Sequence, residues 1–220
     1  MSRQLWQELR LNELNQMVGN AEAVATLRGV TSGFILISGP MGCGKTTAAL
    51  AHSAFLTGVR IAECESRYVP EQCRFVSHCH ATDLEVDNLL WRDDFGFYKP
   101  GIRIIDEAQD LTLKRQQSKL KAVPFSGDLC LILCTTNPEK LDPALRDRCT
   151  KVRLGPLSAK EVRTLVERAC HHREIPFSES IVAALNRAEC FRPRQILNVV
   201  DDLSHGKPLP QAVVDNFSAP

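Results

Sequence analysis

The sequence predicts an α/β protein with a parallel sheet covered on both faces, followed by a small all-helical region. Three observations support this prediction. Short apolar runs alternate with segments of helical composition, and each run is continuous, as in buried parallel strands. A glycine-rich motif separates the first such run from the next helix. After residue 154, well-capped helical segments follow one another. We expect a three-layer domain over 1–154 and a helical domain over 155–220, hinged near Gly155 and Pro156.

The elements of the first domain follow from periodicity and composition. Three of the expected strands are apolar runs, and the expected helices have helical spacing or composition. In chain order we expect a helix over 20–30, a strand over 33–39, a helix over 45–56, a strand over 83–87, a strand over 101–107, a helix over 112–123 and a strand over 129–136.

Four helices are expected in the second domain. Ser158 with Glu161 forms a capping-box pattern before the first of them. Ser178 or Ser180 caps the second. The third begins at a proline and ends before a glycine, within PRQILNVVDDLSHG, and the segment LPQAVVDNF forms the fourth.

Composition narrows the possible classes of protein. The chain has 220 residues, 44% hydrophobic and 24% charged, which is ordinary for a globular protein. The net charge of +1 means that a nucleic-acid site must be a local patch. The N-terminus is too polar for a secretory signal, and no apolar run approaches the roughly 18–20 residues of a membrane span. We therefore expect a cytoplasmic protein, nucleoid-associated if it binds DNA, whose nine cysteines are free thiols or metal ligands.

The motif GPMGCGKT fits the pattern G-x-x-x-x-G-K-[ST] between a predicted strand and a predicted helix. Its glycines let backbone N–H groups converge on phosphate oxygens, and the helix N-terminus adds a favourable dipole. Lys45 would neutralise the β- and γ-phosphates, and the Thr46 hydroxyl would ligate magnesium. We expect ATP with Mg²⁺ at the loop residues Gly39, Pro40, Met41, Gly42, Cys43, Gly44, Lys45, Thr46 and Thr47.

The stretch IRIIDEA, residues 102–108, supplies the second half of a phosphate site. Asp106, at the carboxyl end of the strand, can hold the magnesium shell. Glu107 can orient and deprotonate the attacking water. The alternative is an acidic strand end that caps the next helix. With the loop upstream, the two acids predict an ATP hydrolase rather than a protein that only binds nucleotide.

These motifs resemble the AAA+ ATPase superfamily, and within it the clamp-loader group of bacterial DNA polymerase III gamma and delta-prime subunits and replication factor C subunits. RLNELNQMVGN is similar to the leader that lines the adenine pocket in that group, although Leu11 replaces a proline. LILCTTNPEKLDPALRDRC resembles the stretch from the sensor-1 strand to the S-R-C motif, and RPRQILNVVDDL resembles the sensor-2 helix. The resemblance implies a P-loop NTPase domain of AAA+ type, followed by a helical lid.

The resemblance also implies roles for individual residues. Val18 and Asn20 fall in the leader at the adenine pocket. Thr136 takes the sensor-1 position, with Asn137 a close alternative, and Arg194 would reach the γ-phosphate from the lid.

Arg148 matches the arginine of S-R-C, which in this family reaches the P-loop site of the neighbouring subunit as an arginine finger. Such a residue contributes about 10³–10⁵ in rate. Considered alone, Arg148 is a surface arginine that pairs with Asp147 or Asp142. Asp147 replaces the serine of the family, and it could hold the guanidinium back until a neighbour docks or mark a different subgroup. The basic residues around Arg148 are expected at the subunit interface: Arg146, Lys151 and Arg153.

Residues 64–80 hold several thiols and imidazoles, which zinc prefers. They resemble the four-cysteine zinc module of bacterial gamma and delta-prime subunits, with Val76 in the third place. The implied ligands are Cys64, Cys73, Cys79 and either His78 or His80. The alternative is a set of thiols left from a decayed module.

The segment 111–123 carries four basic residues and no acidic one. The equivalent region in clamp loaders faces DNA, and basic residues there can contact phosphates without reading sequence. The alternative is a solvated helix face. The candidate DNA contacts are Lys114, Arg115, Lys119 and Lys121.

The sequence therefore predicts an ATP-hydrolysing subunit that assembles with copies of itself or with related subunits around DNA. A clamp-loader role in replication, with a sliding clamp as client, is the first hypothesis. Clamp loaders carry a third, collar domain after the lid, so this chain is expected to be a truncated piece or a minimal form. Two alternatives remain: a transposition regulator or helicase or branch-migration loader polymerising on DNA, and a scaffold gated by ATP.

Overall fold

The computed structural model describes residues 4–9, 11, 13–59, 66–69, 74–83, 101–111, 120 and 129–217. Within these residues, one six-stranded sheet has the order β2-β3-β4-β5-β1-β6. Its strands pair in parallel except for β2, which lies antiparallel to β3 at one edge. The strands are β1 (Gly33–Ser38), β2 (Ser66–Val69), β3 (Arg74–His80), β4 (Gly101–Asp106), β5 (Leu129–Thr135) and β6 (Cys149–Arg153).

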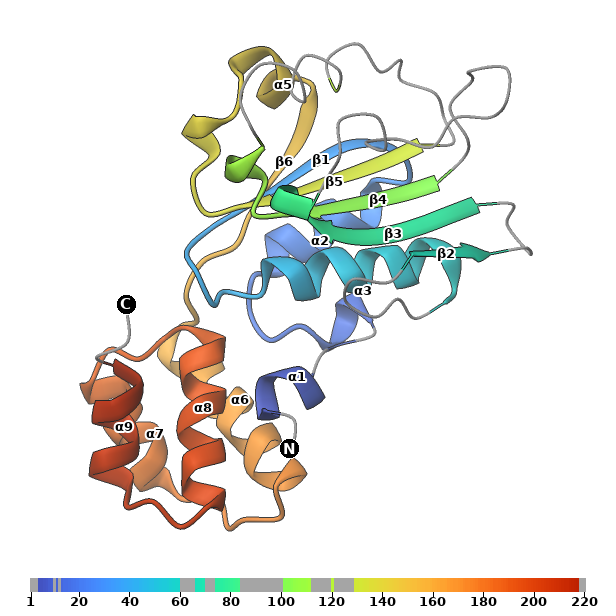
Figure 1. Ribbon diagram of the computed structural model, residues 1–220. Coiled ribbons are helices and arrows are strands. Elements are labelled where there is room, and N and C mark those ends of the chain that lie inside the picture. Colours follow the sequence, from blue (N-terminus) through green and yellow to red (C-terminus); the bar gives the residue numbers. More distant parts are fainter. Residues whose placement is uncertain are drawn as a thin grey trace.

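Helices cover both faces of this sheet (Figure 1). In β1, Ile35 and Ile37 pack with α2 (Ala21–Gly29) and α3 (Lys45–Thr57). Their neighbours Phe34 and Leu36 point to the other face, where α5 (Pro143–Asp147) and short 3-10 turns cover the sheet. Because successive side chains of a strand point to opposite faces, strands this apolar require two covering layers. The predicted three-layer α/β fold is confirmed.

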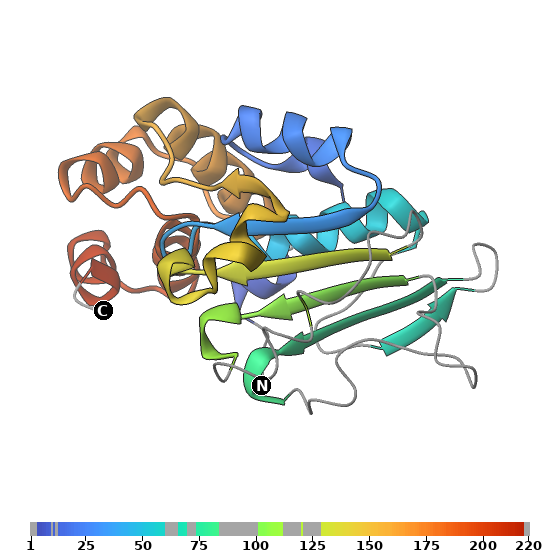
Figure 2. The ribbon, with the colours of Figure 1, turned by 90° about the horizontal axis from the view of Figure 1, so that it is seen from above.

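Four helices follow the sheet in the chain. They form a separate cluster beside the sheet (Figures 1 and 2). The predicted capping box is confirmed: the Glu161 backbone N–H donates to Ser158 Oγ, and the Ser158 N–H donates to the Glu161 carboxylate. Ser178, rather than Ser180, is the N-cap of the second helix. The helices are α6 (Ala159–His172), α7 (Glu179–Arg187), α8 (Pro193–Ser204) and α9 (Leu209–Phe217).

Some elements differ from the prediction. The strand expected over 83–87 is wrong at Asp83, which ends the 3-10 helix Ala81–Asp83, and the rest of that range lies outside the described residues. The helix expected over 112–123 also lies outside them, apart from buried Leu120. Five helices and strands were not predicted as such: α1 (Leu5–Glu8), β2, β3, α5 and β6. The 3-10 helices are Leu14–Gln16, Ala81–Asp83, Ala108–Asp110 and Pro138–Lys140.

His52 is buried on α3, beneath the sheet. Its side chain is 0% exposed, and neither ring nitrogen has a hydrogen-bond partner among the described residues. Phe55 stacks on it, with ring centroids 6.3 Å apart. Burial lowers the pKa of His52 to about 4, because the charged imidazolium loses its hydration there. The imidazole is therefore neutral in the folded protein at pH 7.

We expect His52 to make the protein less stable in acid. The pKa is lower in the folded state than in the unfolded state, so the unfolded state binds more protons below pH 6.5. Stability is lost as pH falls from 6.5 towards 4, by roughly 2–3 kcal/mol from this group alone. Urea unfolding at several pH values should give a shallower pH dependence for His52→Leu. The exposed His171→Gln is the matched control, and an unchanged slope in His52→Leu would contradict the assignment.

Candidate active site

The phosphate-binding loop connects β1 to α3 and approaches other backbone closely. A Cβ added at Gly39 (φ 151°) would lie 2.1 Å from the carbonyl oxygen of Leu154, so only glycine fits there. The Lys45 side chain folds back into the loop, and its Nζ donates to the carbonyl oxygens of Gly39 and Pro40 at 3.0 Å each. Burial lowers the pKa of Lys45, and the carboxylates of Glu107 and Asp106 oppose this shift. The lysine is thus already positioned in the curve of the loop.

Asp106 joins this loop to the end of β4. The Thr46 hydroxyl donates to Asp106 Oδ2 at 2.6 Å, and the Glu107 backbone N–H donates to Oδ1 at 3.1 Å. His78 Nε2 lies 3.7 Å from Oδ2, a longer polar contact. Burial acts to raise the pKa of Asp106. The contacts with His78, Thr46 and the Glu107 N–H together lower it by more than burial raises it, so the net pKa is below the ordinary value. An ionised carboxylate beside a hydroxyl is a pair of hard oxygen ligands that suits Mg²⁺.

Glu107 is held by Gln109, a contact that the sequence did not predict. Gln109 Nε2 donates to Glu107 Oε2 at 2.6 Å. Gln109 Oε1 accepts from the Thr135 hydroxyl at 2.6 Å and from the Thr136 backbone N–H at 3.3 Å. Because a backbone N–H can only donate, the amide must turn its oxygen to β5 and its nitrogen to the glutamate. Glu107 has φ 50°, a left-handed conformation that is uncommon outside glycine and is often found at functional sites.

The two predicted sensor-1 residues occupy the end of β5. Thr136 and Asn137 are both exposed, and neither lines the cavity described below. The Asn137 backbone N–H donates to the Thr135 hydroxyl at 3.0 Å, so Asn137 connects to Glu107 through Thr135 and Gln109, whereas the Thr136 N–H donates to Gln109 directly. Their contact with nucleotide stays a prediction.

A cavity with an empty volume of about 1020 Å³, part of it open solvent, lies between the loop and the helical cluster. It is lined by predicted site residues, by α1 and by the helical cluster α6–α9, which we call the lid from here on. Asn20 also fixes the link to the lid: its Oδ1 accepts from the Gly155 N–H at 2.8 Å, and its Nδ2 donates to the Gly155 carbonyl at 3.3 Å. The predicted residues that line the cavity are Val18, Asn20, Met41, Gly42, Cys43, Gly44, Lys45, Thr46, Thr47, Asp106, Glu107 and Arg194.

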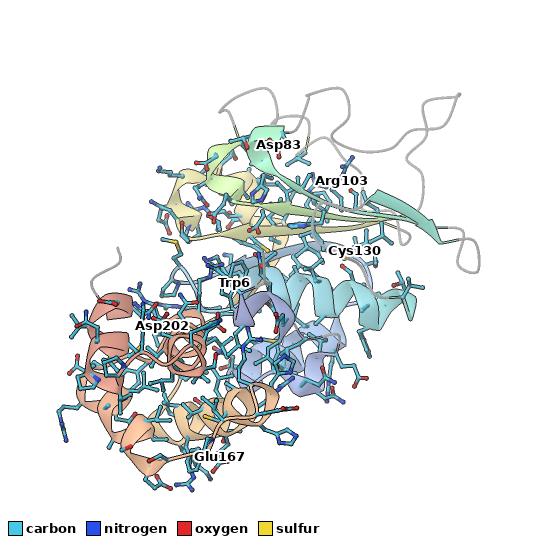
Figure 3. The ribbon with its side chains drawn as sticks, turned by 60° about the horizontal axis from the view of Figure 1, so that its bottom comes forward. Trp6, Asp83, Arg103, Cys130, Glu167 and Asp202 are labelled. Atoms are coloured by element: carbon cyan, nitrogen blue, oxygen red, sulfur yellow. The ribbon has the colours of Figure 1, made fainter. Side chains whose placement is uncertain are left out.

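The lining of the cavity includes apolar as well as charged side chains. Leu9, Leu11, Met17 and Leu197 contribute apolar side chains, and Trp6 adds an aromatic ring. Figure 3 shows Trp6 on α1, between the helical cluster and the sheet domain. Apolar side chains suit a base, and the lysine and the loop suit phosphates.

Arg148 lies away from this cavity, at the C-cap of α5. Its guanidinium carbon is 4.8 Å from the centroid of the Phe34 ring, and its Nη1 donates to the Leu120 carbonyl at 3.3 Å. Asp147 Oδ1 lies 3.7 Å from Lys151 Nζ, so Lys151 is a cationic partner of this carboxylate. Arg148 does not line the cavity of its own chain, which agrees with the finger prediction, and its action on a neighbour stays a prediction.

The zinc and DNA predictions fall mostly outside the described residues. Cys64 and Cys73 are not described, nor are the four basic side chains Lys114, Arg115, Lys119 and Lys121. Cys79 Sγ lies 3.6 Å from the Ile104 carbonyl oxygen, and His80 lies beside His78 with ring centroids 6.0 Å apart. No group of three metal-ligating side chains occurs within the described part of the chain. Both predictions stay open.

A glycine-rich loop with an embedded lysine, beside a threonine paired with a strand-end aspartate, defines a P-loop nucleoside triphosphate-binding protein. Residues 35–157 match the family described as "ATPase family associated with various cellular activities (AAA)". The chain therefore belongs to the AAA family.

Relatives within the family include replication proteins. The chain is 29% identical over 224 residues to DNA polymerase III subunit gamma/tau of Mycobacterium tuberculosis, covering 92% of this chain and 39% of that protein. It is 24% identical over 204 residues to the replication factor C small subunit of Staphylothermus marinus, covering 89% of this chain and 60% of that protein. The chain thus spans less than two thirds of the length of each of these relatives.

Solved structures show the same fold. The Thermotoga maritima RuvB Holliday junction branch migration motor superposes with a TM-score of 0.65 at 20% identity, over 95% of this chain and 72% of that one. At this identity the likeness concerns the fold alone. No described helix of our chain has the length and apolarity needed to cross a membrane.

Proposed function

We propose that this AAA ATPase hydrolyses ATP as one subunit of an oligomeric assembly on DNA, with a clamp-loader-like role in replication. One observation carries the hydrolysis: the Thr46 hydroxyl lies 2.6 Å from Asp106 Oδ2, and both line one cavity with Lys45 and Glu107. The names of the relatives, DNA polymerase III subunit gamma/tau and replication factor C small subunit, support the role in replication.

Each residue of the site would have a distinct chemical role. Lys45 and the loop amides would bind the phosphates, and Arg194 would approach them from the lid. Thr46 and Asp106 would hold Mg²⁺, which when bound supplies positive charge against the phosphate oxygens. Glu107 would take a proton from the attacking water, and the Gln109 amide would keep its carboxylate in place. Arg148 would complete the site of a neighbouring subunit.

DNA should stimulate the ATPase if the proposed role is correct. We expect primed DNA to raise the turnover rate, and we expect added salt to remove the stimulation because DNA binding releases counterions. Phosphate release at several salt concentrations measures this. Replacing Lys114, Arg115, Lys119 and Lys121 with glutamine should reduce the stimulation, whereas Lys160→Gln on α6 should not.

Electron microscopy with a non-hydrolysable ATP analogue separates the alternatives. A closed ring that encircles DNA supports a clamp-loader-like assembly. An open filament on DNA would instead support a transposition regulator or helicase loader. A turnover rate that does not change when DNA is added would contradict a DNA motor and would support a scaffold gated by ATP.

A further inference from the structure

Trp6 contacts Arg194, the lid residue that the sequence analysis predicted to reach the γ-phosphate. The guanidinium carbon of Arg194 lies 4.6 Å from the centroid of the Trp6 ring, and both residues line the cavity. Trp6 Nε1 donates to Gln4 Oε1 at 2.5 Å, so the polar edge of the indole is bound within its own segment. The ring face is therefore presented to the guanidinium.

The lid holds the helix that carries Trp6. Leu5 is 0% exposed within the core of the lid, and its backbone N–H donates to Asp201 Oδ2 at 3.3 Å. Arg173 of the lid bridges two carboxylates: its Nη1 donates to Glu8 Oε2 at 2.6 Å, and its Nε donates to Asp201 Oδ1 at 2.9 Å. A four-residue helix is too short to be stable alone, so these contacts set the position of the indole.

The backbone of Arg194 is held against the phosphate loop. Its N–H donates to the Gly42 carbonyl at 3.2 Å, and a Cβ built at Gly42 would lie 3.2 Å from Arg194 Cβ. The long side chain beyond this point is exposed and could adopt many rotamers in solution. Stacking on Trp6 selects among these rotamers.

A stacked guanidinium keeps its hydrogen-bonding capacity. Its five N–H donors lie in the plane of the group, at the edge, whereas the ring contact uses the flat face. Arg194 can therefore stack on Trp6 and donate to an anion at the same time. An arginine already oriented loses less conformational entropy when the anion binds.

We propose that Trp6 is a positioning residue for Arg194, holding the guanidinium so that its donor edge faces the terminal phosphate of bound ATP. This inference rests on the proposed function, because it requires that the cavity binds ATP. It makes the N-terminal helix part of the nucleotide site, through the lid rather than through the loop.

A double-mutant cycle tests the proposal. Trp6→Leu keeps an apolar side chain but removes the aromatic face, and we expect it to weaken the binding of a non-hydrolysable ATP analogue about threefold to tenfold. Trp6→Phe keeps an aromatic face and should restore most of the affinity. ADP lacks the terminal phosphate, so its affinity should change less. In an Arg194→Ala background, Trp6→Leu should have no further effect. Calorimetric titration gives each affinity, and thermal melting checks the fold of each variant.

Fluorescence gives a reading that a purely structural role would not produce. The chain has two tryptophans, so Trp91→Phe leaves Trp6 as the single indole. We expect the emission of Trp6 to change on adding the ATP analogue, to change less with ADP, and to lose this difference in Arg194→Ala.

The outcomes are distinct. An equal Trp6→Leu loss with and without Arg194 would overturn the proposal, because Trp6 would then act on the nucleotide directly. Trp6→Leu with wild-type affinity, or Trp6→Phe as weak as Trp6→Leu, would also overturn it. If the wild-type protein bound no ATP, the proposed function itself would fail.

Discussion

Glu107→Gln is expected to reduce ATP turnover by about 10²–10⁴ while leaving nucleotide binding intact. The substitution removes the base but keeps the shape of the side chain. The new amide oxygen can still accept from Gln109 Nε2, which lies 2.6 Å from Glu107 Oε2. The phosphate contacts of Lys45 and the loop do not involve this carboxylate, so binding should persist. Phosphate release and calorimetry measure the two effects separately.

Two controls accompany this variant. Glu174 also has a left-handed backbone, with φ 55°, but it is exposed in the lid, so Glu174→Gln should retain full turnover. Lys45→Ala should lose binding as well as turnover, because it removes the charge that neutralises phosphate. Wild-type turnover in Glu107→Gln would show that the base lies elsewhere.

The charged half of the site was predictable because its residues are contiguous. Gly39, Lys45 and Thr46 lie on one turn between a strand and a helix, and that turn creates the anion site by itself. The prediction of Asp106 required a further inference about the sheet, since this residue lies 60 positions from Thr46 in sequence. Parallel strands place their carboxyl ends at one edge, so a strand ending in acids was enough to bring it to the loop.

The contacts made by α1 and by Gln109 could not be predicted in the same way. The four residues of α1 show no periodicity, and Trp6 meets Arg194 only because the lid packs beside the loop. The role of Gln109 required the register between β4 and β5, which brings Thr135 to it. These contacts depend on long-range packing that no local pattern carries.

Three strands, β2, β3 and β6, were missed, and for β3 and β6 the reasons are local. In β3, RFVSHCH places polar residues among apolar ones, and its histidines and cysteine were interpreted as metal ligands instead. His78 is in fact buried beside Asp106, at 3.7 Å. Strand β6 has only five residues at the edge of the sheet, with a mixed burial pattern, so it lacks the continuous apolar run of a central strand.

Arg148→Ala is expected to lower turnover by about 10³–10⁵, the range measured for arginine fingers, without weakening ATP binding. The side chain does not line the cavity of its own chain, so its loss should leave that cavity unchanged. Arg187→Ala is the control, since Arg187 is an exposed arginine at the end of α7 that does not line the cavity, and it should retain full turnover. Thermal melting measures how much stability is lost with the contact between Arg148 and Phe34.

Mixing two inactive variants shows whether Arg148 acts on a neighbour. Arg148→Ala keeps an intact phosphate loop, and Lys45→Ala keeps the finger, so each alone should be nearly inactive. In a mixed assembly some interfaces join a wild-type finger to a wild-type loop, and activity should return. An arginine that served its own nucleotide could not be rescued, because no chain in the mixture carries both residues. If Arg148→Ala were fully active alone, the residue would be a surface arginine packed on Phe34.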